Sequence, residues 1–169
     1  MKKILVVFTV VLMSALGASA QKFAYVDSEY ILKQIPAYQN AQNQLNTLSS
    51  DWQKEIEVQY TEIDDLYKEY QSEQILMTEE MRVSKEELII RKEKEAKDLQ
   101  QKRFGPDGDL FKKREELVKP IQDQVYAAIK KIAKDGSYAI IFDKASDLMM
   151  LYTSPKYNKS KDVLDQLGY

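Results

Sequence analysis

The chain has 169 residues, and its 25 Lys and Arg against 27 Asp and Glu give a formal net charge of −2. His and Cys are both absent, which excludes imidazole bases, thiol nucleophiles and the usual zinc and copper ligands. The mildly acidic balance disfavours a general attraction to nucleic acid, so we expect no nucleic-acid partner.

The first 20 residues have the three parts of a secretory signal. Lys2 and Lys3 form a positive start, residues 4–13 are apolar apart from one Thr, and Ala18 and Ala20 suit a cleavage site. A transmembrane anchor is the less favoured alternative, because this apolar run is shorter than the roughly 20 residues that span a bilayer. We expect export and cleavage after Ala20. Because Lys2 and Lys3 are then removed, the net charge of the remaining chain becomes two units more negative.

After the signal, aromatic and β-branched residues at 23–27 predict a strand. Ser28 is the expected cap of a short helix over residues 29–34, which ends near Ile35 because Pro36 disfavours helical geometry in the residue before it. We assign residues 21–36 to the N-terminal part of a small β body.

Residues 37–134 predict one long helical hairpin. A stripe of large apolar and aromatic side chains recurs about every 3.6 residues, which requires a helical partner for burial. The stripe consists of Leu45, Leu48, Trp52, Ile56, Tyr60, Ile63, Leu66 and Tyr70.

The hairpin tip is expected at residues 74–78. Thr78 is a good N-cap for the returning helix, and Glu79 and Glu80 then lie in its first turn, where the helix dipole favours acids. The outgoing helix over residues 37–74 would be about 57 Å long at roughly 1.5 Å per residue.

The returning helix has a weaker stripe of Met81, Leu88, Ala96 and Leu99, with charged residues at positions that a firm seam would fill with Leu or Ile. We expect the outer half of the hairpin, near its tip, to be loosely packed and mobile. A break follows at residues 104–108, where Gly105, Pro106 and Gly108 form either a hinge or a plain loop between two helices.

Beyond the break, an apolar stripe over residues 110–132 restores the helix, and Pro120 is expected to bend it. The helix should end near Gly136. Two strand candidates at 138–142 and 148–152 and a last helix at 161–167 complete the C-terminal part of the body, residues 135–169. The expected fold is mainly α, with a small three-stranded sheet whose exposed edges predict oligomerisation.

The chain resembles the Skp/OmpH family of periplasmic chaperones over essentially its whole length after the signal. The resemblance is carried by Tyr25-Val26-Asp27-Ser28, residues 31–38, the long hairpin, Pro120-Ile121, Ala127-Ala128-Ile129, Ile132-Ala133, residues 138–143, Ser160, Asp162-Val163-Leu164 and Leu167-Gly168. It implies a homotrimer in which a β-barrel body carries three helical tentacles. It also implies a periplasmic protein that holds unfolded outer-membrane proteins without ATP or any cofactor.

The residues expected to form the oligomeric body come from the three strands. They are Phe23, Tyr25, Val26, Ile140, Ile141, Phe142, Leu148, Met150 and Tyr152.

One departure from the family concerns charge, because better-known members are strongly basic. Here residues 49–81 hold 10 acids and 2 bases, whereas residues 82–103 hold 8 bases and 5 acids. The favoured explanation is pairing of opposite charges across the hairpin, which sets its register. The alternative is a basic patch facing clients or lipid, formed by Arg82, Lys85, Arg91 and Lys92.

At the tip, Leu76, Met77 and Met81 either contact apolar clients, for which flexible Met side chains are suited, or simply close the apex. Tyr67 lies beside the seam and is expected to face the cavity, while Tyr25, Tyr60, Tyr70 and Tyr138 are expected to be buried and structural.

Catalysis is disfavoured, because neighbouring acids such as Asp64 and Asp65 point in different directions and have no apolar pocket to separate their pKa values. The expected export, the long helical arms and the family resemblance together imply a non-enzymatic holdase chaperone. The alternative is a structural or adaptor coiled coil of the cell envelope with one fixed partner. Lipopolysaccharide or a membrane surface is a third and less favoured partner, because neither helix shows a strongly basic amphipathic face.

Overall fold

The computed structural model describes residues 21–146 and 149–169, so the expected signal at residues 1–20 and the position Leu148 lie outside the described part. The described chain divides into two compact units. Residues 35–124 form a unit that we call the arm, and residues up to 34 together with 125–169 form a unit that we call the body.

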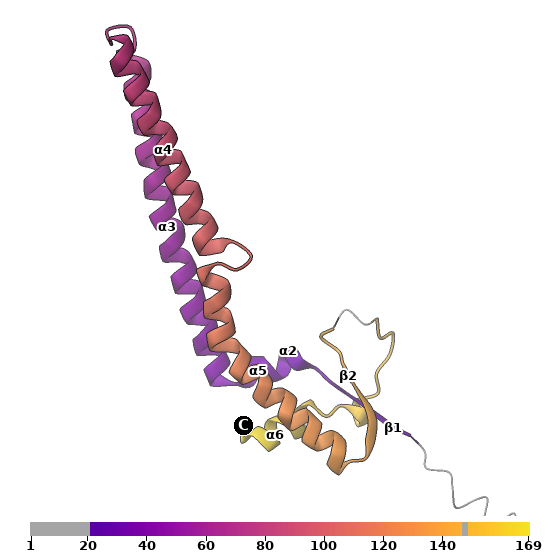
Figure 1. Ribbon diagram of the computed structural model, residues 1–169. Helices are drawn as coiled ribbons and strands as arrows, with labels where there is room; N and C mark the ends of the chain where they lie inside the picture. The colour runs from indigo at the N-terminus through magenta and orange to yellow at the C-terminus, as the bar shows by residue number, and fades with distance from the viewer. Residues whose placement is uncertain (1–20, 147–148) are drawn as a thin grey trace, which may run out of the picture. The chain divides into compact units, whose positions relative to one another are not determined.

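The arm is built on an antiparallel hairpin of α3 (Pro36–Glu73) and α4 (Glu79–Phe104), which pack along each other (Figure 1). Pro36 opens α3 from an extended Ile35, as its ring requires. The 38 residues of α3 correspond to about 57 Å of helix. Within the described ranges, no helix combines the length and apolar character needed to cross a bilayer.

The turn of the hairpin occupies residues 74–78. The Thr78 side chain accepts a hydrogen bond of 3.3 Å from the Met81 backbone N–H, and Glu79 and Glu80 occupy the first turn of α4. The predicted N-cap is therefore confirmed, and it directs the chain into α4.

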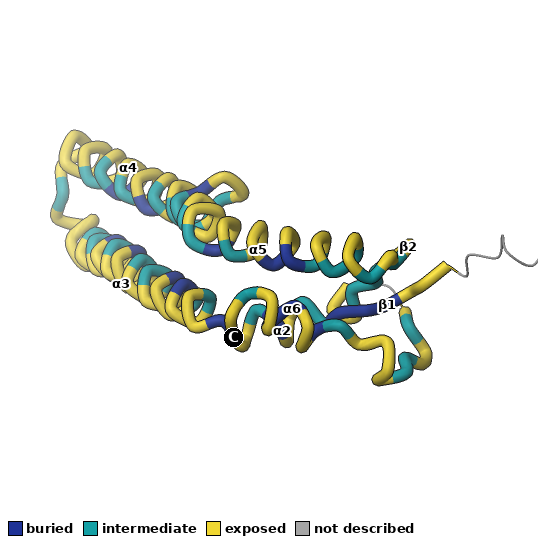
Figure 2. The backbone as a smooth tube through the Cα atoms, turned by 90° about the horizontal axis from the view of Figure 1, so that it is seen from below, coloured by how far each residue is buried: buried dark blue, intermediate teal, exposed yellow. Residues whose placement is uncertain are grey.

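The two helices share a narrow seam, and Figure 2 shows buried residues recurring along both α3 and α4 between longer exposed stretches. Ile56 and Ile63 of α3 and Ile89 and Ala96 of α4 are buried at seven-residue spacing. The expectation for Tyr60 is wrong, because its ring is exposed. The seam is only one side chain wide there, and the Tyr60 hydroxyl lies 3.4 Å from Gln100 Oε1 at its edge.

A loop over residues 105–108 separates α4 from α5 (Asp109–Asp135), and a hinge at Gly105, Pro106 and Gly108 stays a prediction. The first part of α5, up to residue 124, belongs to the arm. Here Val118 packs with Ala41 and Leu45 of α3 in a small core. The helix continues through Pro120.

Arg103 connects the two sides of this loop through ion pairs and a cation–π contact. Its guanidinium lies 2.7 Å from Asp109 Oδ2 at the start of α5 and 3.2 Å from Glu55 Oε2 on α3. The same group sits 4.8 Å from the centre of the Trp52 ring, which in turn contacts Phe104 edge-on at 6.3 Å. The loop is thus closed by charge, by hydrogen bonds and by a cation–π contact.

The body contains a two-stranded parallel sheet, in which β1 (Lys22–Val26) pairs with β2 (Tyr138–Asp143). Parallel strands cannot be joined by a tight turn and need a long crossover, which the whole arm supplies here. Beside the sheet, α2 (Ser28–Gln34) packs on α6 (Ser160–Leu167) through the fully buried Ile31 and Val163. A 3₁₀ turn, η1 (Pro155–Tyr157), lies next to β1.

The expected third strand at 148–152 is wrong for its described residues. Residues 149–152 are irregular, and the side chains of Leu151 and Tyr152 are 94% and 83% exposed. Apolar composition favours a strand only where a neighbouring backbone completes the hydrogen bonds. Within the described chain, this segment pairs with neither β1 nor β2.

Four segments of the body meet in a hydrogen-bond network around two aspartates. Asp143 Oδ1 and Oδ2 accept hydrogen bonds from Ser28 N–H and Ser28 O–H at 3.0 and 2.5 Å. The Ser160 hydroxyl accepts a hydrogen bond from Asp27 N–H at 2.8 Å. Asp27, not Ser28, caps α2, because its carboxylate accepts from Tyr30 N–H. Ser28 was the expected cap, but its hydroxyl donates a hydrogen bond to Asp143 instead.

The seam offers a matched test of arm stability in two neighbouring isoleucines of α4. Ile89 is 2% exposed and Ile90 is 63% exposed. We expect Ile89→Ala to lower the free energy of unfolding by about 2–3 kcal/mol, because it leaves a cavity in the seam. The control Ile90→Ala should change it by less than about 0.5 kcal/mol. Urea unfolding followed by circular dichroism measures both, and equal losses would contradict the assignment of the seam.

Candidate functional site

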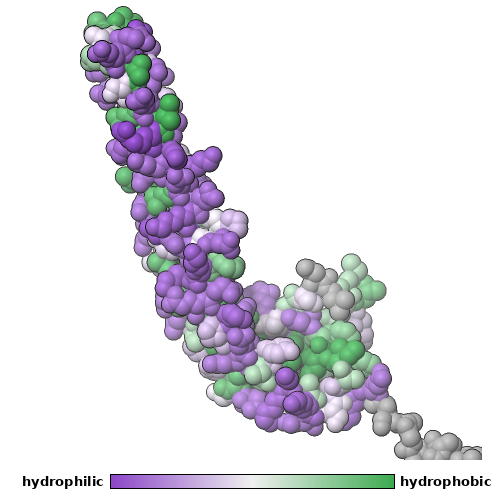
Figure 3. Space-filling view, in the orientation of Figure 1, coloured by the Kyte–Doolittle hydropathy of each residue, from purple (hydrophilic) through white to green (hydrophobic). Residues whose placement is uncertain are grey.

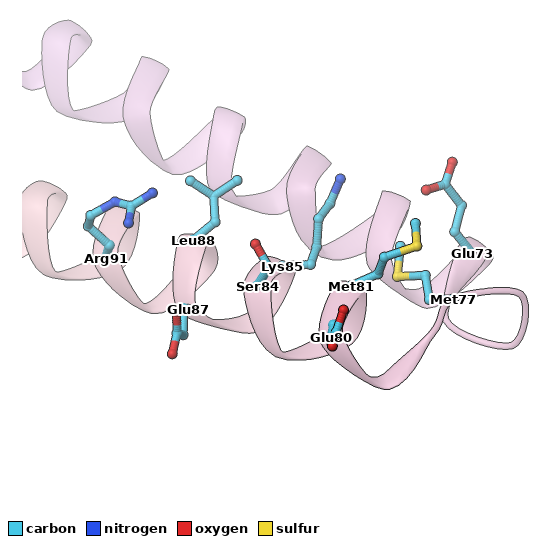
Figure 4. A pocket seen from close by; sticks show the side chains of 9 residues that line it. All are labelled: Glu73, Met77, Glu80, Met81, Ser84, Lys85, Glu87, Leu88 and Arg91. Atoms are coloured by element: carbon cyan, nitrogen blue, oxygen red, sulfur yellow. The ribbon is translucent and has the colours of Figure 1, made fainter.

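A groove of about 480 Å³ lies along α4 next to the hairpin turn (Figure 4). Its lining residues come from the end of α3, the turn and the first half of α4. They are Glu73, Met77, Glu80, Met81, Ser84, Lys85, Glu87, Leu88 and Arg91.

Helical geometry explains how these residues come together. Glu80, Ser84, Glu87 and Arg91 follow one another at spacings of three and four residues, so they lie on one face of α4. In Figure 4, Met81, Lys85, Leu88 and Arg91 point towards α3, whereas Glu87 points away from it. The groove therefore combines apolar side chains and two cations with an acidic rim formed by Glu73, Glu80 and Glu87.

The turn beside the groove exposes further apolar surface. Ile75 and Leu76 are each 89% exposed, and Met81 is more than half exposed. Figure 3 shows hydrophobic residues gathered at this end of the arm. Within the described chain, these side chains have little to pack against, so they are available to a partner.

The structure brings together half of the residues predicted for client binding. Met77, Met81, Lys85 and Arg91 line the groove, and Leu76 lies on the adjoining turn. The other three predicted residues, Tyr67, Arg82 and Lys92, lie outside the groove lining.

Charge pairing across the hairpin accounts for two of the four bases in the predicted basic patch. Lys85 Nζ lies 2.8 Å from Glu69 Oε1, and Lys92 Nζ lies 3.0 Å from Glu62 Oε1, both on α3. Arg82 pairs within α4, with Glu79 at 2.6 Å. The pairing explanation is therefore confirmed for Lys85 and Lys92. Among the four predicted bases, only Arg91 has no carboxylate at ion-pair distance in the described residues.

The sequence pattern did not predict a role in the groove for Glu73, Glu80, Ser84, Glu87 or Leu88. The available signal was the spacing of Glu80, Ser84, Glu87 and Arg91, which marks a single helix face. Arg103, which joins α3, α4 and α5, was also missed, because its partners are far apart in the sequence.

On the arm, two tyrosines of α3 donate hydrogen bonds to acids of α4. Tyr67 O–H donates to Glu93 Oε1 at 2.9 Å, and Tyr70 O–H donates to Glu86 Oε1. Each carboxylate raises the pKa of its tyrosine, first through the hydrogen bond and then with partial loss of hydration and charge repulsion. Tyr67 is thus held at the edge of the seam.

A second exposed apolar surface belongs to the body. A hollow of about 730 Å³ is lined by residues of β1, β2 and the irregular segment that follows, among them Phe23, Phe142, Met150 and Tyr152. Phe23 and Phe142 stack at 6.5 Å, and Ile140 is exposed nearby on β2. Of the residues predicted for the oligomeric body, Tyr25 and Val26 are buried within the chain itself and Ile141 is half-buried.

Metal chemistry finds no support among the described residues, because no group of three or more acidic side chains is placed to hold an ion. The arrangement is instead one of exposed apolar side chains bordered by charge. Such surfaces serve binding.

The elements together define a long antiparallel helical hairpin with a small parallel sheet and short packing helices. The sequence model of the family described as outer membrane protein (OmpH-like) matches residues 22–167, and the chain belongs to this family. No curated protein sequence matches the chain.

A crystal structure from Caulobacter crescentus CB15, whose protein is assigned as an OmpH-like outer membrane chaperone, shares the fold. The TM-score is 0.67 at 11% sequence identity, and the match covers 89% of this chain and 86% of that chain.

The tyrosine pairs predict a pH dependence of the arm. A raised pKa in the folded state means that these hydrogen bonds stabilise fully below the ordinary tyrosine pKa of 10.0 and are lost as pH rises through the raised value. We expect the double variant Tyr67→Phe/Tyr70→Phe to remove the latest part of the tyrosinate absorbance titration. The variant Glu86→Gln/Glu93→Gln keeps both phenols and should move that part to lower pH. If Glu86→Gln/Glu93→Gln leaves the latest part of the titration at the wild-type pH, the pairing is refuted.

Proposed function

We propose that this protein is a periplasmic, ATP-independent holdase chaperone. It binds unfolded outer-membrane proteins between helical arms and prevents their aggregation during transit. The proposal is supported by membership in the OmpH-like family and by the fold shared with an OmpH-like outer membrane chaperone.

The observation that carries the proposal is the apolar end of the arm. Ile75 and Leu76 are almost fully exposed, and Met77 and Met81 adjoin them in an open groove. Exposing such side chains is unfavourable in water and is expected where a protein takes up apolar partners. Methionine side chains adapt to partners of different shape, which suits a protein with many clients.

We also propose that the body forms a homotrimer through a shared β-barrel. Residues 149–152 are apolar and lie outside any strand of their own chain, the side chains of Met149, Leu151 and Tyr152 are exposed, and β2 has an unpaired edge among the described residues. A second copy can supply the missing backbone partner and cover the side chains of Leu151 and Tyr152. Such an assembly would place several arms around one cavity.

Holdase activity is tested by diluting a urea-unfolded outer-membrane protein into buffer with the purified processed protein and following light scattering. We expect suppression of aggregation at stoichiometric amounts, and weaker suppression by Met77→Gln/Met81→Gln, because the amide removes apolar contact at nearly constant length. The control Val58→Gln/Ile90→Gln removes exposed apolar side chains elsewhere on the arm and should act like the wild type. Unchanged aggregation with the wild-type protein would count against the function itself.

A pull-down from cells separates this function from that of an adaptor. A chaperone should retain a spectrum of outer-membrane proteins, whereas an adaptor should retain one dominant protein.

Oligomerisation is tested by sedimentation velocity over a range of concentrations. We expect a trimer for the wild type and dissociation for Leu151→Gln/Tyr152→Gln, because the polar side chains weaken the buried contact between copies. The control Tyr126→Gln changes an exposed residue of α5 and should leave the trimer intact. A monomeric wild type at every concentration would rule the assembly out.

A further inference from the structure

The acidic rim of the groove is uncompensated at the end nearest the turn. In the described residues, Glu73 and Glu80 have no Lys or Arg at ion-pair distance. The nearest groove cation, Lys85, already pairs with Glu69 at 2.8 Å. At the far end, the groove is lined by both a carboxylate, Glu87, and a cation, Arg91, although the two are not at ion-pair distance in the described residues.

The apolar part of the groove lies beside this excess of negative charge. Met77, Met81 and Leu88 line the same concavity as Glu73 and Glu80. In Figure 4, Met81 and Leu88 point towards α3, and Glu80 belongs to the end of the groove near the turn. A ligand that fills the groove therefore meets apolar surface and carboxylates together.

The size of the groove suits a short stretch of extended polypeptide. From Glu80 to Arg91 the helix advances about 16 Å at roughly 1.5 Å per residue. That length corresponds to about five residues of extended chain at roughly 3.3 Å each. A groove of about 480 Å³ also has room for one large side chain with its neighbours.

We infer that this groove takes an unfolded polypeptide segment in which Lys or Arg flanks a large apolar residue. The apolar residue rests on Met77, Met81 and Leu88, and the flanking cation lies near Glu73 and Glu80. This inference rests on the proposed chaperone function and adds a charge preference to it. An anionic lipid surface is disfavoured by the same carboxylates, because they would repel its headgroups.

The test uses the full processed protein and three short peptides that carry a neutral fluorophore. The peptides share a Gly/Ser host sequence and contain Lys-Phe-Lys, Gln-Phe-Gln or Glu-Phe-Glu. Fluorescence anisotropy should give the tightest binding for the cationic peptide. The preference should shrink as salt rises, because charges at an exposed site are screened over about 8 Å at physiological ionic strength.

The groove itself is tested by Glu73→Gln/Glu80→Gln, which neutralises both carboxylates with little change of shape. We expect the ratio of cationic to anionic peptide affinity to fall about three- to tenfold, as for the loss of two exposed charge contacts. The matched control Glu57→Gln/Glu95→Gln removes one exposed acid from each helix outside the groove and should keep the wild-type ratio.

Several outcomes would overturn the inference. Equal affinity of the wild type for the three peptides, or no binding of any of them, removes the charge preference. An equal fall of the ratio in the control shows an effect of overall charge, and no fall in either variant places the site elsewhere. A changed sedimentation profile of Glu73→Gln/Glu80→Gln with unchanged peptide binding would make the groove a contact between copies.

Failure of the inference and failure of the function can be told apart. If the wild type still suppresses aggregation of an unfolded outer-membrane protein while the peptides show no charge preference, only the inference fails. If aggregation is not suppressed either, the proposed chaperone function fails.

Discussion

The arm depends on a seam about one side chain wide, in which β-branched residues of α3 and small or β-branched residues of α4 repeat every seven positions. Ile56 and Ile63 face a helix that contributes only Ile89 and Ala96 as buried side chains. So little apolar area cannot by itself fix the register of two long helices, because a slip changes few contacts. The polar side chains at the edges of the seam must therefore supply much of the specificity.

Those edges carry two different sets of contacts. Ion pairs join Glu55, Glu62 and Glu69 of α3, seven residues apart, to bases of α4. Tyrosine hydrogen bonds join Tyr67 and Tyr70 to acids of α4. The side chains of Lys85 and Lys92 are only 20% and 33% exposed, as is typical of lysines whose aliphatic stems lie along apolar surface. Single exposed pairs stabilise little, but a regular series excludes other registers.

The parts of the fold that follow from local sequence could be predicted. Pro36 begins α3 through its fixed backbone geometry, Thr78 caps α4 with its side chain, α5 ends just before Gly136, and the stripe of α3 is visible in its spacing. The third strand failed because residues 149–152 show strand composition, whereas a strand exists only with a partner edge. Tyr60 was misplaced because the pattern does not report how wide the seam is.

The site was less predictable than the fold for a related reason. Met77 and Met81 stand out in the sequence as flexible apolar residues next to a turn, so their role could be proposed directly. Glu73 and Glu80 are ordinary helix acids until the turn brings the end of α3 beside the start of α4. Arg103 likewise gains its importance from Glu55, Trp52 and Asp109, which only the folded chain places around it.

One distribution of charge thus has two consequences along the arm. Where basic residues of α4 lie opposite the acids of α3, from Lys85 to Arg103, the charges pair and hold the register. Closer to the turn, α4 begins with acids that favour its N-terminus through the helix dipole, so Glu73 meets no base across the hairpin. The negative end of the arm is therefore a consequence of how the hairpin turns. The exposed apolar side chains lie beside this negative charge. Any segment that docks on them must therefore carry a charge that the carboxylates do not repel.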